Sequence, residues 1–401
     1  MRNLSAAGFR LLLALVFVLA AAPVRKAGAC TTVIVSSQAS GSGRPLLWKQ
    51  RDTDSPHNVL LHVTGGKYAY TAVFNASDTR RERAFGGANE AGFAIVNNIS
   101  YNLAEESYDE WANSKVINAA LATCRTLADF EQLLENWPQP RNVAANFGVI
   151  DAFGGAAYFE TGDTKSTRFD VEPGSWLVRS NFSISGREDE GSGMARYETA
   201  EYLMSRHRGK FTPDFLIDGL GRSFYNYELG ADMSRRSPRG IAVDLDFIPR
   251  YTTVSSICIE GIGANDNPAS SVIWTAIGYT PCCYAVPVWV AAGSEIPAFL
   301  MPASEGSPAP ANQLAEELMH RVHPAKRDAA GKYIDFRLLR PILKAVRAAE
   351  KQEFISGREL DREMRRSFRQ EAVRRYNQEA EIRFERFLEK TNGLVNPLVQ
   401  P

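Results

Sequence analysis

The chain has 401 residues, and its 46 Lys and Arg balance its 46 Asp and Glu, so the formal net charge is zero. This balance argues against nucleic-acid binding, which normally needs a basic excess. Charged residues make up 23% and hydrophobic residues 44% of the chain, values typical of a globular protein and not of a disordered or fibrous one. Five cysteines are too few for a disulfide scaffold, and the odd number leaves at least one thiol free or paired between chains.

The first 29 residues have the pattern of a secretory signal peptide. Arg2 and Arg10 precede the apolar run Leu11–Ala22, and Ala27–Ala29 supplies the small residues of a cleavage site just before Cys30. We therefore expect export to the periplasm or the medium. The alternatives are an uncleaved anchor and a lipoprotein acylated on Cys30, although Ala27 stands where a lipoprotein signal has a large aliphatic residue. No later stretch has the ~20 apolar residues of a membrane span.

Cleavage after residue 29 would make Cys30 the first residue of the mature chain. Its α-amino group would then titrate near about 7.7–8.0 and could take the proton of a neighbouring nucleophile. Cys30–Ser36 is a β-branched run that predicts a strand, and Leu46–Arg51 predicts the returning strand of a hairpin. The hairpin brings Arg51 back toward Cys30, with Asp54 three residues further on. A guanidinium favours a thiolate, and a carboxylate can orient an amine.

The rest of the chain alternates further strands with a few helices and ends in a helical region. Helical periodicity marks Lys115–Trp137 and Met194–Arg208, while the glycine pair Gly86-Gly87 is interpreted as a turn. After the Ala- and Pro-rich linker Pro302–Ala311, the run Gln313–Lys390 is Arg/Glu/Ala-rich with apolar residues at helical spacing. The predicted domains are a signal peptide (1–29), a catalytic domain (30–310) and a charged helical extension (311–401). The remaining predicted strands are Val59–Val63, Tyr68–Phe74, Phe93–Asn98, Val143–Asp151, Ala156–Glu160, Trp176–Asn181, Thr252–Cys258 and Ala285–Val290.

Several common chemistries leave no trace in the sequence. The five histidines form no H-E-x-x-H or zinc-type spacing with cysteine, and there is no phosphate-binding loop, dinucleotide fingerprint or G-x-S-x-G elbow. We therefore predict no metal and no cofactor. Cys124, in a helical run, is interpreted as a small buried hydrophobe. The disulfide state of Cys124, Cys258, Cys282 and Cys283 is left open.

Five stretches in order along the chain resemble the N-terminal-nucleophile (Ntn) hydrolases that use a cysteine. They are the opening C-T-T-V-I-V followed by Arg51-Asp52-Thr53-Asp54, and the segments at 86–98, 146–160, 176–182 and 192–197. The resembling groups are choloylglycine hydrolases with penicillin V acylases, cysteine dipeptidases, and the isopenicillin-N acyltransferase and carcinine hydrolase group. The resemblance covers about residues 30–290 and implies an α+β fold, a four-layer αββα sandwich of two antiparallel sheets.

The resemblance implies a role for each matching residue. Cys30 is similar to the nucleophile, with its own α-amino group as the general base. Arg51 and Asp54 match the pair that holds thiolate and amine in register. Asn181 matches the side chain that donates to the oxyanion, and Arg196 matches a distal arginine that supports the site electrostatically.

The second oxyanion donor falls on Asn98 or its neighbour Asn97, and we favour Asn98. Phe182 and Ser183 follow Asn181 where the acyltransferase group has a histidine, which puts the leaving-group side in doubt. The implied protein is an exported amidohydrolase that cleaves the C–N bond of a small linear amide through a Cys30 thioester. An acyltransferase, a cysteine dipeptidase and a non-catalytic envelope or binding protein with a lipidated Cys30 remain alternatives. The substrate and the formation of a homo-oligomer are left open.

Overall fold

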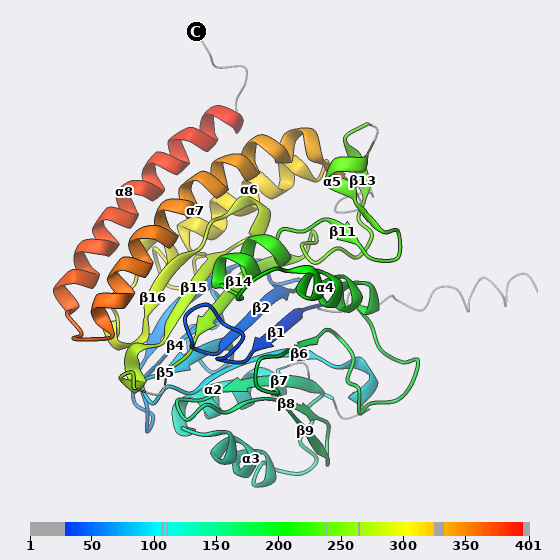
Figure 1. Cartoon of the computed structure of the whole chain (residues 1–401), viewed down its shortest axis with the longest axis vertical. Coiled ribbons are helices and arrows are strands. Elements are labelled where there is room, and N and C mark those ends of the chain that lie inside the picture. Colours follow the sequence, from blue (N-terminus) through cyan, green and yellow to red (C-terminus); the bar gives the residue numbers. More distant parts are fainter. Residues whose placement is uncertain are drawn as a thin grey trace, which may run out of the picture.

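A computed structural model describes residues 29–105, 108–109, 111–237, 239–263, 265–324 and 333–395, so the predicted signal peptide lies outside the described residues except for Ala29. Two large antiparallel sheets form the centre of the molecule (Figure 1). The first sheet has six strands, in the spatial order β10 (Trp176–Arg179), β1 (Thr31–Val35), β2 (Leu46–Asp52), β14 (Thr253–Glu260), β15 (Val272–Ile277) and β16 (Val286–Trp289).

The second sheet has seven strands that follow one another in sequence order, and it packs face to face on the first. The inner faces meet in apolar side chains such as Ile34 and Leu47, which close on Gly148 of the opposite sheet. Because side chains alternate between faces, every second residue of β1 and β2 enters this inter-sheet layer. The seven strands are β3 (Asn58–Val63), β4 (Tyr70–Asn75), β5 (Ala84–Asn89), β6 (Ala94–Ile99), β7 (Ala145–Ile150), β8 (Ala156–Thr161) and β9 (Ser166–Asp170).

Two helices, α2 (Ala112–Thr123) and α3 (Leu127–Glu135), cover the outer face of the seven-stranded sheet (Figure 1). The sequence predicted a single helix over Lys115–Trp137, and this prediction is wrong because the structure has two helices there. Thr126 interrupts it because its side chain accepts a hydrogen bond from the Asp129 N–H in a capping box that begins α3. Phe130 of α3 then packs edge-on against Phe147 and Phe159 of the sheet.

The outer face of the six-stranded sheet is covered by the C-terminal helices α6 (Pro310–Val322) and α7 (Phe336–Met364), with α8 (Gln370–Val395) packed on α7. The Phe354 ring of α7 stacks on Trp274 of β15 with ring centroids 4.4 Å apart. Glu350 of α7 forms a buried ion pair with Arg222. The predicted four-layer αββα sandwich with a helical C-terminal region is thus confirmed, and the helices of that region form one of its layers.

Short elements complete the chain. The glycine pair Gly86-Gly87 lies in strand β5 and not in a turn as predicted. Position 87 requires glycine because a Cβ atom there would lie 2.2 Å from the Thr71 carbonyl oxygen of the adjacent strand. Strands β9 and β15 were not predicted either. The short elements are β11 (Tyr225–Asn226), β12 (Ala231–Asp232), β13 (Ile241–Val243), β17 (Tyr333–Asp335), α4 (Met194–Arg206), α5 (Met233–Arg236), the π-helical segment Phe215–Leu220, and 3-10 turns at Tyr101–Leu103, Pro268–Ser270, Thr280–Cys282, Val290–Ala292 and Ala298–Leu300.

Candidate active site

Strand pairing brings Cys30 next to Arg51, although the two are far apart in sequence. β1 and β2 pair antiparallel with Thr31 opposite Gln50, which places Cys30, just before β1, beside Arg51. Successive residues of a strand point to opposite faces. Cys30, Lys49 and Arg51 therefore share the inner face, which is turned toward the seven-stranded sheet.

The backbone of Cys30 is held on both sides by side chains predicted as site residues. Its N–H donates to Asn181 Oδ1 at 2.8 Å, and its carbonyl oxygen accepts from Arg196 Nη1 at 2.7 Å. Arg196 is completely buried and also donates to Asn181 Oδ1 at 3.0 Å and to Thr31 Oγ1 at 3.1 Å. Asn181 Nδ2 donates to the Ile99 carbonyl at 2.9 Å. The position of Cys30 is thus fixed by a closed set of hydrogen bonds.

A cavity of about 250 Å³ opens next to Cys30 between the ends of the two sheets. Cys30 is 7% exposed, and its sulfur lies 3.9 Å from the Asp52 carbonyl oxygen. The wall combines charged, polar and aromatic side chains from both sheets and from α2. The lining residues are Cys30, Lys49, Arg51, Asp52, Thr53, Asp54, Ser55, Phe85, Asn97, Ile99, Trp111, Asn113 and Ser114.

Lys49 is a buried cation in this cavity that the sequence analysis missed. Its Nζ donates to the Phe85 carbonyl and to Asn97 Oδ1, both at 2.8 Å. Burial lowers the pKa of Lys49 to about 8, and the charge of Cys30 opposes this shift. The alternation of β2 carried a signal for it, because a residue two positions before Arg51 has to share its face.

Arg51 is the second buried cation, and its guanidinium is held by the neighbouring sheet. Nη2 donates to Asn75 Oδ1 at 2.9 Å and Nη1 to Asn58 Oδ1 at 2.5 Å. The guanidinium lies 3.6 Å from the centroid of the Phe85 ring, a cation–π contact. Burial lowers the pKa of Arg51, and the negative charge available at Cys30 opposes this. Arg51 therefore lies beside Cys30, as the predicted hairpin implied, and its charge acts on the Cys30 thiol.

Two carboxyl groups follow Arg51, and the buried one was not predicted. Asp54 lines the cavity but is exposed. Asp52 is 2% exposed, and its Oδ1 accepts from Thr253 Oγ1 at 2.6 Å while Oδ2 has no hydrogen-bond partner among the described residues. Burial raises the pKa of Asp52 to about 7 against the opposing charges of Arg250 and Arg196.

The neighbours Asn97 and Asn98 have different surroundings. Asn98 is completely buried, accepts from Thr32 Oγ1 at 3.1 Å and donates to the Ser180 carbonyl, and it does not line the cavity. Asn97 lines the cavity, and its oxygen accepts from Lys49, which leaves the amide NH₂ as its remaining polar group. This placement moves the candidate oxyanion donor from Asn98 to Asn97.

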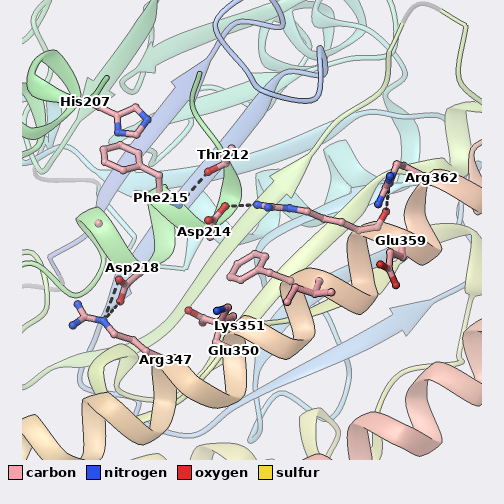
Figure 2. Close-up of a pocket in the computed structure, with 14 residues that line it drawn as sticks. His207, Thr212, Asp214, Phe215, Asp218, Arg347, Glu350, Lys351, Glu359 and Arg362 are labelled. Carbon is pink, nitrogen blue, oxygen red and sulfur yellow. Dashed lines mark hydrogen bonds and ion pairs between the residues drawn. The ribbon is translucent and has the colours of Figure 1, made fainter. Parts of the chain in front are cut away.

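A larger groove of about 710 Å³ lies on the opposite face of the six-stranded sheet, between Phe215–Leu220 and α7 (Figure 2). Ion pairs cross it, such as Arg347 Nε to Asp218 Oδ1 at 2.8 Å. The His207 ring at its end is tilted by 33° against the Phe215 ring, with the ring centroids 3.8 Å apart. No cysteine lines this groove. The smaller cavity at Cys30 is therefore the candidate active site.

The other cysteines lie outside this cavity. All five thiols are free and buried, including the adjacent pair Cys282 and Cys283. Burial raises the pKa of Cys124 to about 11 and that of Cys283 to about 12, so neither is a reactive thiolate near neutral pH. Within the described ranges, no group of three His, Cys, Asp or Glu residues could hold a metal ion, and no helix is long and apolar enough to cross a membrane.

Comparison with known proteins gives no match to a family model or to a curated sequence. Solved structures of similar fold include a Caenorhabditis elegans ortholog of N-acylethanolamine-hydrolyzing acid amidase, with 12% identity and a TM-score of 0.40 over 58% of this chain and 92% of that chain. A mutant form of the conjugated bile acid hydrolase from Clostridium perfringens has 10% identity and a TM-score of 0.40 over 65% and 92% of the two chains. An Agrobacterium tumefaciens penicillin V acylase has 15% identity and a TM-score of 0.38 over 64% and 85%.

At these identities and TM-scores the likeness concerns the course of the chain alone. Function is therefore inferred from the geometry around Cys30.

Proposed function

We propose that this chain is an exported cysteine amidohydrolase of the N-terminal-nucleophile type, which cleaves the C–N bond of a small linear amide. In the mature protein, Cys30 is the first residue and the nucleophile, and its α-amino group is the general base. The observation that carries the proposal is the position of Cys30, whose backbone is hydrogen-bonded by Asn181 and Arg196 and whose sulfur lies beside a cavity with two buried cations.

The first half of the reaction acylates Cys30. Its α-amino group accepts the thiol proton, and the thiolate attacks the amide carbonyl carbon. Arg51 favours the negative sulfur through its charge. When the tetrahedral intermediate collapses, the C–N bond breaks, the proton passes from the α-amino group to the leaving nitrogen, and a thioester remains. Water, deprotonated by the same amine, then attacks the thioester carbonyl carbon. The C–S bond breaks, the acid is released, and the proton returns from the amine to the Cys30 sulfur.

The oxyanion requires donors fixed before the reaction begins. Asn97 contributes an amide NH₂ whose orientation is set by the Lys49 hydrogen bond to its oxygen. Asn181 Nδ2 donates to the Ile99 carbonyl, and Asn181 does not line the cavity, so we assign Asn181 to holding the Cys30 nitrogen through Oδ1 and not to the oxyanion. Removal of one such donor in acyl-transfer enzymes typically costs about 2.7–4 kcal/mol.

The experiment is a mass-spectrometric substrate screen on the secreted protein, after its mature N-terminus has been determined by intact mass. The panel comprises N-acyl amino acids, conjugated bile salts, penicillin V, dipeptides and β-alanyl amines. We expect Cys30→Ala to abolish turnover and Cys30→Ser to reduce it sharply. Acid quenching during turnover should trap an acyl group on the Cys30 peptide.

Cys124→Ala is the matched control, because Cys124 is also a buried free thiol but does not line the cavity. It should turn over substrate like the wild type. Unchanged turnover in Cys30→Ala, or a mature chain that begins at another residue or carries a lipid on Cys30, would refute the proposed mechanism.

A further inference from the structure

The cavity at Cys30 contains more buried positive charge than the proposed reaction uses. Lys49 and Arg51 are 3% and 4% exposed, and both enter the cavity from the inner face of β2. Asp52 acts on both cations through its charge, but burial raises its pKa to about 7, so it is only partly ionised near neutral pH, and Asp54 lies exposed at the cavity wall. A Cys30 thiolate balances one of the two cations. Since buried charges are normally paired, the other cation can be paired by an anion that is not part of the chain.

Lys49 is the cation with spare binding capacity. Arg51 is engaged by two asparagine oxygens and by the face of the Phe85 ring. An ammonium group has three donors, and the described residues give Lys49 two acceptors, the Phe85 carbonyl and Asn97 Oδ1, both uncharged. Within the described residues, no carboxylate lies within ion-pair distance of Lys49.

The size of the cavity limits what can reach this ammonium group. About 250 Å³ is below the roughly 300–1,000 Å³ of pockets that hold drug-sized ligands. Phe85, Ile99 and Trp111 give the cavity an apolar part, while Asn113 and Ser114 add neutral polar groups. A short carbon chain that ends in a carboxylate fits both the volume and the mixed lining, whereas a steroid or a long acyl chain exceeds the volume.

Building on the proposed function, we propose that the acyl half of the substrate carries a second carboxylate that Lys49 binds, so that the substrates are monoamides of short dicarboxylic acids. The acyl half is chosen because the leaving nitrogen must lie beside the Cys30 nitrogen, which contacts Asn181, a residue outside the cavity lining. Lys49 instead lies against Phe85 and Asn97. The bound carboxylate takes no part in bond making, and hydrolysis releases the free dicarboxylic acid.

The test compares two substrates of equal chain length, the N-glutaryl and N-pentanoyl amides of one fluorogenic amine. We expect wild-type kcat/KM to favour the glutaryl amide by about tenfold or more, the size of one hydrogen bond to a charged group. Lys49→Gln should remove this preference mainly through KM, and Lys49→Arg should retain part of it. The matched control is Lys115→Gln, which removes an exposed lysine of α2 and should leave the preference unchanged.

Three results would overturn the proposal. The first is no preference of the wild type for the glutaryl amide, and the second is a preference that follows a carboxylate placed on the amine half. The third is an equal loss of kcat/KM for both substrates in Lys49→Gln, together with slower alkylation of Cys30 by iodoacetamide. The last result would assign Lys49 to the thiolate and not to the substrate. Protection of wild-type Cys30 from iodoacetamide by free glutarate tests the anion site without any Lys49 variant, in case Lys49→Gln does not fold. Absence of that protection would also count against the anion site.

Calorimetric titration of glutarate into Cys30→Ala, with and without Lys49→Gln, separates the two proposals. Lys49-dependent binding in a protein whose wild type hydrolyses no amide would support the anion site and refute the proposed reaction. Cys30-dependent hydrolysis of neutral amides without glutarate binding would refute the anion site and leave the proposed reaction standing.

Discussion

Glu350→Gln tests whether the C-terminal helices belong to the same cooperative unit as the sheet that carries Cys30. Glu350 in α7 accepts two hydrogen bonds of 2.6 Å from Arg222 and one of 2.7 Å from the Ala285 N–H. The Arg222 side chain is completely buried and that of Glu350 is 4% exposed. The substitution leaves the guanidinium with the partly exposed Asp218 as its one charged partner among the described residues.

Breaking a buried ion pair by removing one partner typically costs about 3–5 kcal/mol. This is a large part of the about 5–15 kcal/mol by which native domains are stable. We expect a loss of this size in the free energy of unfolding, measured by urea titration with tryptophan fluorescence. Glu359→Gln removes an exposed carboxylate from the same helix and should stay within about 0.5 kcal/mol of the wild type.

The double variant Arg222→Met/Glu350→Met sharpens the test. Replacing both members of a buried pair by apolar residues is often neutral or stabilising, because no charge remains buried alone. We therefore expect the double variant to be more stable than Arg222→Met or Glu350→Met. Additive losses, or a Glu350→Gln variant within about 1 kcal/mol of the wild type, would show that α7 is not held to the sheet by this pair.

Two further predictions concern groups near Cys30. Arg196→Lys keeps the positive charge but cannot reproduce the four hydrogen bonds to Cys30, Thr31, Asn181 and Asp246, so kcat/KM should fall by about tenfold or more in the hydrolysis assay; wild-type kinetics would contradict the positioning role. Asp52 has a folded-state pKa raised from 3.8 to about 7, so its stabilising contribution is complete below about pH 4 and is lost as the pH rises through about 7. The unfolding free energy of the wild type relative to Asp52→Asn should accordingly drop by about 4 kcal/mol between pH 4 and pH 8, and a constant difference over that range would exclude a buried, proton-binding Asp52.

Local sequence patterns were sufficient to predict the strands that carry the nucleophile. The β-branched run Cys30–Ser36 and the returning run Leu46–Arg51 form the paired strands β1 and β2, and their register puts Arg51 beside Cys30 as expected. The glycine pair at 86–87 was assigned to a turn because glycine is common in turns. Its actual cause is the close approach of Thr71 from the neighbouring strand, a contact that depends on tertiary pairing and leaves no local signal.

The candidate site was predictable in part. The motifs selected Asn181 and Arg196, and the structure places both in contact with Cys30. Lys49 escaped because a lysine is normally exposed, and its burial here depends on acceptors supplied by the opposite sheet. The same holds for Asn97, since sequence alone does not determine which of two adjacent asparagines enters a cavity between two sheets.

The inter-sheet hydrogen bonds of Lys49 and Arg51 make the site sensitive to the distance between the sheets. Both cations belong to one sheet, and all their side-chain and backbone acceptors belong to the other. A folding intermediate with a single sheet formed would hold the thiol without its fixed cations, so its thiolate would be less favoured. Hydrolytic activity would therefore report on the docking of the two sheets. A substitution meant to enlarge the substrate range is best made at Trp111 beside α2, because Trp111 makes none of the hydrogen bonds that hold Lys49 and Arg51 between the sheets.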